Sequence, residues 1–99
     1  MNGSIEFGKE EICNAKIKFT QSLVGENDNL IIQIGFELAK GRVVTTNKFV
    51  LDGEKMKNIL NILELRKWEE LPRKYDRVSV LNEKVIKIGN IINEKWIKI

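Results

Sequence analysis

Few side chains in this sequence belong to the types that carry out catalysis. Histidine, the commonest general base and metal ligand, is absent. The single cysteine, Cys13, alternates in phase with Ala15 and Ile17, which indicates a core thiol rather than a nucleophile. Zinc needs several Cys or His ligands, and the glycines fit no phosphate-binding loop. We therefore expect a protein that is not an enzyme and that holds no metal and no cofactor.

The carboxylates have structural explanations. Glu26 and Asp28 fall in a turn that lacks the spaced ligands of a calcium-binding loop. Asp52 is a residue type favoured at a helix N-cap. Asp76 precedes Arg77, and we expect it to pair with a basic neighbour.

Binding chemistry is better represented, because basic residues gather in several places beside aromatic ones. Phosphate binding requires cations on one side, and single-stranded nucleic acid also requires exposed rings. Acidic residues are interleaved with the basic ones and the net charge is only +3, so a mixed solvated surface is the competing interpretation. The candidate partner-binding residues are Lys40, Arg42, Arg73, Lys74, Arg77 and Trp96.

The two tryptophans are expected to differ. Trp68 follows a helical pattern and is predicted to anchor the core. If Ile97 and Ile99 face the core, Trp96 and Lys98 face outward, because strand residues alternate. An exposed Trp on an edge strand would then point to a partner or to a second copy of the chain.

The elements that carry these residues follow from periodicity. Alternation predicts strands from Cys13 to Thr20, from Leu30 to Leu38 and from Val43 to Val50, with a further short strand around Ile5–Phe7. In the first strand, Phe19 is in phase with the apolar side. Turns are expected at 24–29 and 39–42. The first half therefore predicts an antiparallel meander.

The period changes after Asp52. Apolar residues at helical spacing (Met56, Ile59, Leu60 and Leu63) predict one amphipathic helix, which Pro72 prevents from continuing. Three short strands are predicted at 77–81, 84–88 and 95–99, with a turn at 82–83 and a bulge at Gly89. The predicted fold class is α+β, with an antiparallel β-meander, one amphipathic helix and a second antiparallel β-meander in a single domain, 1–99.

Composition predicts the compartment. No apolar run is long enough to span a membrane, and the first residues lack the layout of a secretory signal. One cysteine excludes an intramolecular disulfide framework and suits a reducing cytoplasm.

Two segments, WEELPRKYDRV and KVIKIGNIINEKW, resemble a pattern in a family of small uncharacterised phage and prophage proteins of low-GC bacteria. The matching positions are Trp68, Glu69, Leu71, Lys74, Tyr75, Arg77 and Val78, then Ile88, Gly89, Asn90, Ile91, Ile92, Glu94, Lys95 and Trp96. Where that family has a glycine-rich strand before the helix, this chain has GRVVTTNKFVLD at 41–52.

The resemblance implies a genomic setting rather than a chemistry. Small proteins of phages often bind a component of the host, and host defence is a frequent target. The first expectation is therefore a stoichiometric, anti-CRISPR-like inhibitor in the bacterial cytoplasm, which occludes a host defence protein or its nucleic acid. The alternatives are a nucleic-acid-binding accessory protein of phage replication or recombination, and a sponge for a nucleotide defence signal. A homodimer formed by strand pairing is compatible with each.

Overall fold

The computed structural model describes residues 9–99, so the strand predicted around Ile5–Phe7 lies outside the described residues. The described chain contains one α-helix, α1, at Gly53–Leu63. Its strands are β1 (Glu11–Val24), β2 (Leu30–Glu37), β3 (Val43–Thr46), β4 (Phe49–Val50), β5 (Tyr75–Leu81), β6 (Lys84–Gly89) and β7 (Trp96–Lys98). The α+β class is confirmed at this level, since the chain is mostly strand with one helix.

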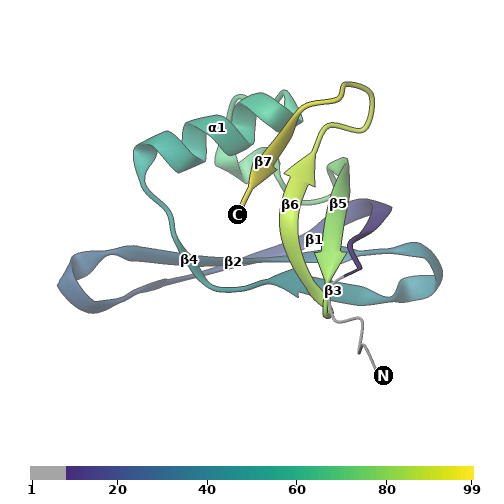
Figure 1. The fold of residues 1–99 in the computed structure, drawn as a ribbon. Helices are drawn as coiled ribbons and strands as arrows, with labels where there is room; N and C mark the ends of the chain where they lie inside the picture. Colours follow the sequence, from purple (N-terminus) through teal and green to yellow (C-terminus); the bar gives the residue numbers. More distant parts are fainter. Residues whose placement is uncertain (1–8) are drawn as a thin grey trace.

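The predicted arrangement of two separate meanders is not the arrangement found, because β1 joins both halves of the sheet. Its first part pairs with β5 from Glu11 to Lys16, and its second part pairs with β2 from Lys16 to Val24. On the other side, β3 and β6 pair in parallel. The strands β1, β5, β6, β3 and β2 therefore close into a barrel (Figure 1). Strands β4 and β7 add to β2 and β6.

The connectivity of the barrel is that of an OB-fold. Three antiparallel strands are followed by a helix and two further antiparallel strands; the last of these runs parallel to the third, and the fourth pairs with the first. This is the five-stranded Greek-key barrel that several classes of binding protein use. The fold by itself assigns no ligand.

The helix forms where the sequence predicts it. The Asp52 side chain accepts a hydrogen bond from the Lys55 amide at 2.7 Å, which caps the first turn. Ile59 and Leu63 are buried, and α1 packs against β6 and β7 (Figure 1). Trp68 packs against the core, as predicted. Cys13 also packs there, and burial raises the pKa of its thiol.

Two strand predictions need correction. The register of β1 against β2 shifts between Ile17 and Phe19, so the Phe19 ring lies over Gly35 on the outer face instead of entering the core. The single strand predicted at 43–50 is divided after Thr46, and Phe49–Val50 pairs with β2 as β4. Neither change is visible in the alternation of residue types, because a bulge depends on the partner strand.

Candidate functional site

The outer face of β5, β6 and β7 brings charged and aromatic side chains together in two rows. One row runs across the strands from Ser79 through Lys87 to Lys98, which are register partners. Ile88 and Ile97 form the intervening inward-facing pair. The outward orientation of Trp96 and Lys98 that the alternation allowed is therefore confirmed.

The second row consists of Arg77, Gly89 and Trp96. The indole of Trp96 lies over Gly89, where a Cβ atom would come within 2.7 Å of the ring. Gly89 was predicted to form a bulge, but the β5–β6 register shift lies between Ser79 and Val80. The glycine instead provides space for the ring.

Hydrogen bonds hold the Arg77 guanidinium beside this ring. Its carbon lies 5.1 Å from the Trp96 ring centroid, within the range of a cation–π contact. Nε donates to the Asn90 carbonyl at 2.9 Å, and Nη2 donates to the Asn93 carbonyl at 3.0 Å. The buried Asn90 amide donates to the Ile62 carbonyl at the end of α1. The loop before β7 is therefore tied to the helix, which fixes the start of the strand that carries Trp96.

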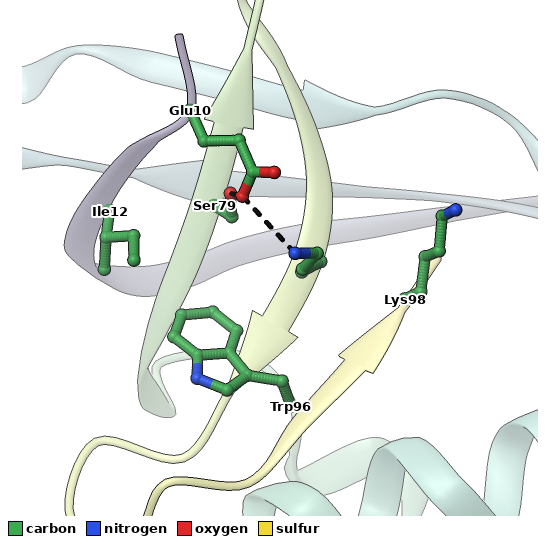
Figure 2. Close-up of a pocket in the computed structure, with 6 residues that line it drawn as sticks. Glu10, Ile12, Ser79, Trp96 and Lys98 are labelled. Atoms are coloured by element: carbon green, nitrogen blue, oxygen red, sulfur yellow. Dashed lines mark hydrogen bonds and ion pairs between the residues drawn. The ribbon is translucent and has the colours of Figure 1, made fainter.

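A hollow of about 330 Å³ lies beside the indole (Figure 2). Its lining residues are Glu10, Ile12, Ser79, Lys87, Trp96 and Lys98. The Glu10 carboxylate accepts a hydrogen bond from the Ser79 hydroxyl at 2.6 Å and lies 3.4 Å from the Lys87 ammonium. The hydrogen bond from Ser79, followed by the nearby lysines, lowers the pKa of Glu10 below its ordinary value. This end of the hollow thus stabilises a negative charge.

The other predicted binding residues do not join this site. Lys40 is exposed in the turn between β2 and β3, and Arg42 forms ion pairs with Glu11 and Glu83 at 3.3 and 2.6 Å. Arg73 and Lys74 lie in the turn before β5, where backbone groups of both pair with Ile17. Of the six residues predicted, the structure brings only Arg77 and Trp96 together.

Several residues of the hollow were not predicted as site residues. Glu10 and Ser79 are far apart in the sequence and have no distinctive spacing. A signal did exist for Lys98, which is two residues from Trp96 and therefore on the same face of the strand. Lys87 could be added only once the register of β6 against β7 is known.

A second surface differs in character. We call it the ribbon: residues 18–24 of β1 and 30–34 of β2, with β4. Leu23, Val24 and Val50 are exposed at 48, 69 and 46%. Leu23, Ile31 and Val50 form one row across the three strands. Beyond Lys18 this part of β1 pairs with β2 alone among the described strands, so its other edge is open.

Asp76 is a buried polar residue that belongs to neither surface. Its side chain is fully buried, and neither carboxylate oxygen has a hydrogen-bond partner in the described chain. Desolvation by burial raises its pKa to about 8. The local pairing with a basic neighbour expected from the sequence is therefore wrong.

No family model, no curated protein and no solved structure matches the chain. Within residues 9–99, no group of three or more His, Cys, Asp or Glu side chains converges as a metal site would require. No helix in the same range is both long and apolar enough to cross a membrane.

Proposed function

We propose that this protein is a stoichiometric binding protein, without turnover, that docks on a partner protein through the ribbon. The observation that carries the proposal is the set of exposed aliphatic side chains beside an open strand edge. Leu23, Val24 and Val50 expose large apolar surface, and no charged residue occurs in β1 after Lys18. Apolar patches of this kind are typical of protein interfaces.

The open edge of β1 supports the same proposal. An extended segment of a partner can add a strand to such an edge, where main-chain hydrogen bonds supply affinity and alternate side chains supply specificity. Natural proteins commonly protect exposed edges with charged residues or proline. The segment from Phe19 to Val24 contains neither. Because the β1–β2 hairpin is one of the long arms of the molecule, the edge is accessible to a large partner (Figure 1).

The proposed partner is a host defence protein in the bacterial cytoplasm, which the chain would inhibit by occlusion. Support for this narrower statement is the resemblance of 68–78 and 88–96 to phage and prophage proteins. Occlusion requires a rigid surface rather than catalytic groups, and the closed barrel provides one.

The test is affinity capture from a defence-carrying host lysate with wild type and two matched variants. Leu23→Asp places a charge in the ribbon, whereas Ile92→Asp changes an exposed residue (82%) in the loop before β7. We expect one protein to be captured in near-equal amount by wild type and by I92D, and to be at least tenfold depleted with L23D. Equal capture by both variants would show that the ribbon is not the docking surface.

A second copy of the chain is the competing occupant of the same edge. Light scattering after gel filtration distinguishes it, since a wild-type dimer that L23D converts to a monomer would assign the ribbon to self-association. In that case the host partner would have to bind elsewhere, and the proposal as stated would fail.

Nucleic-acid binding is a second candidate function, favoured by the OB-fold connectivity. In this fold the second and third strands of the barrel commonly bind oligonucleotides. Here that face carries the half-buried Phe19 ring over Gly35, with Thr45 as the next register partner. Binding to oligonucleotides should weaken steeply as salt rises. Absence of binding at low salt would remove this candidate.

A further inference from the structure

The hollow beside Trp96 is lined by two lysines, Lys87 and Lys98, that the register places opposite each other on neighbouring strands. Lys87 and Lys98 are direct partners in the antiparallel pairing of β6 and β7, and both face outward. Like charges directly opposite each other on two strands are destabilising. Within the described chain Lys87 is paired with Glu10, while no salt bridge involves Lys98. An anion between the two ammonium groups would relieve the repulsion.

The Glu10 carboxylate already occupies part of this anion position. It accepts from Ser79 at 2.6 Å and from Lys87 at 3.4 Å. Glu10 lies just before β1, and its side chain is 41% exposed, so its departure would not break a strand pairing. A carboxylate has two oxygens and one charge, whereas a phosphate monoester has three terminal oxygens and about −1.5 to −2 charges. The phosphate would therefore match the Ser79 hydroxyl and the Lys87 ammonium better. The Lys98 side chain points away from Glu10 and would reach the phosphate by a change of rotamer (Figure 2).

The remaining wall of the hollow is suited to a flat ring. Trp96 lines the hollow and is held in place by Gly89 beneath its ring and by Arg77 beside it. Ile12 adds exposed apolar surface close to the indole (Figure 2). Stacking of a base on an aromatic side chain contributes about 1–3 kcal/mol.

We propose that this hollow binds a nucleoside monophosphate, whose base stacks on the Trp96 indole and whose phosphate replaces the Glu10 carboxylate between Ser79, Lys87 and Lys98. The volume of about 330 Å³ lies at the lower end of the range for small-molecule sites, which suits one nucleotide rather than two. Glu10 acts as an internal competitor. The site lies on β5, β6 and β7 and is separate from the ribbon.

The test is a titration with adenosine 5′-monophosphate, followed by the quenching of Trp96 fluorescence in a Trp68→Phe background at low salt. Calorimetry on the unmodified chain provides the same affinity without the background substitution. We expect saturable binding that weakens about tenfold in Lys98→Gln and is unchanged in the control Lys48→Gln, an exposed lysine between β3 and β4. Glu10→Gln should bind several-fold tighter, because it removes the competing charge.

Four results would overturn the proposal. These are no saturable binding by either method, equal binding of adenosine without its phosphate, no gain of affinity in E10Q, and binding to oligo(dT) that strengthens with chain length. The last would assign the surface to single-stranded nucleic acid instead. L23D should leave the nucleotide affinity unchanged, and K98Q should leave partner capture unchanged, so that the two proposals can fail separately.

Discussion

Two glycines in this sheet each lie beneath an aromatic ring from the neighbouring strand. Gly35 supports Phe19 and Gly89 supports Trp96, and in both pairs the ring and the glycine are register partners. At either glycine an added Cβ would come closer than 3.0 Å to ring atoms. The same backbone device thus presents a flat ring on two outer faces of one barrel.

The neighbours of the two rings differ in charge. On the side of the ribbon, the next outward row beside Phe19 is Gln21 paired with Gln33, and both are neutral. On the other side, Lys16 and Glu37 form a mutually compensating pair. The next outward row beside Trp96 contains Lys87 and Lys98. The first face therefore continues into the apolar ribbon, and the second encloses an anion position. A ring on a glycine therefore creates a platform, while the flanking row determines the class of ligand.

The largest change in the free energy of unfolding should come from Asp76, which lies inside the barrel and therefore affects both outer faces equally. Between about pH 4 and 8 the folded chain keeps the Asp76 proton, because its pKa is raised from 3.8 to about 8, whereas the unfolded chain has lost it. The free energy of unfolding should therefore fall as pH rises through this range, by an amount on the order of 5 kcal/mol. Asp76→Asn should remove this dependence and stabilise the chain at pH 8.

Urea unfolding at pH 5, 6.5 and 8 measures the Asp76 effect in both chains. The carboxyls whose pKa is lowered, Glu10 and Glu70, add stability as pH rises through their ordinary value of 4.5, so they oppose the Asp76 effect only at the acid end of this window. A wild-type stability that is constant or rises from pH 5 to 8 would contradict the assignment. If D76N disrupted the outer face that carries Phe19 but not the one that carries Trp96, or the reverse, the effect on the two faces would not be equal.

The next largest change in stability should differ between the two ring–glycine pairs. Gly35→Ala is expected to destabilise by about 2–3 kcal/mol and Gly89→Ala by about 1 kcal/mol. Gly35 is buried on a strand paired on both sides, so neither it nor Phe19 can move easily. Trp96 is only half-buried and belongs to the three-residue strand β7, which pairs with β6 alone among the described strands, so its ring has more freedom to tilt than a ring on a barrel strand.

Urea midpoints of the two alanine variants measure this difference. Gly53→Ala is the control, because no atom lies within 4 Å of the Cβ position there. Equal losses at Gly35 and Gly89 would show that β7 is as rigid as the barrel strands.

The smallest change in stability should come from the row that contains Lys87 and Lys98. Lys98→Glu replaces a like-charge pair opposite Lys87 with an attractive one, and should stabilise the chain by about 0.2–1 kcal/mol. The same change should abolish nucleotide binding, since it places a negative charge at the anion position. Thermal unfolding and the fluorescence titration measure the two consequences, with Lys48→Glu as the control. A destabilised K98E would mean that the loss of the attraction between Lys98 and Glu10 outweighs the relief of the repulsion between Lys98 and Lys87.

Local sequence patterns predicted most elements but not their assembly. The N-cap at Asp52, the α1 stripe and the turn at Asn82–Glu83 are all present, and both turn residues have positive φ, as a tight hairpin of this kind requires. The bulge after Ile17 and the division of the third strand were not predicted. Both depend on what the partner strand allows, and a single strand pattern does not contain that information.

The candidate site shows the same division. Trp96 was predicted as an aromatic residue on an expected edge strand, and Arg77 was predicted together with Arg73 and Lys74 as basic residues of one segment. Lys40 and Arg42 were selected as basic residues of a hairpin. The structure separates Arg77 from the other four, which lie away from the hollow.

The sequence alone determined the residue types available, the alternation of each strand and the position of the helix. These follow from local physics, namely side-chain periodicity, capping and the restrictions of proline. Only the tertiary structure decided that β1 closes a barrel, that Lys87 and Lys98 become partners, and that Glu10 reaches Ser79. Those outcomes depend on strand register, and register is set by the packing of the whole core.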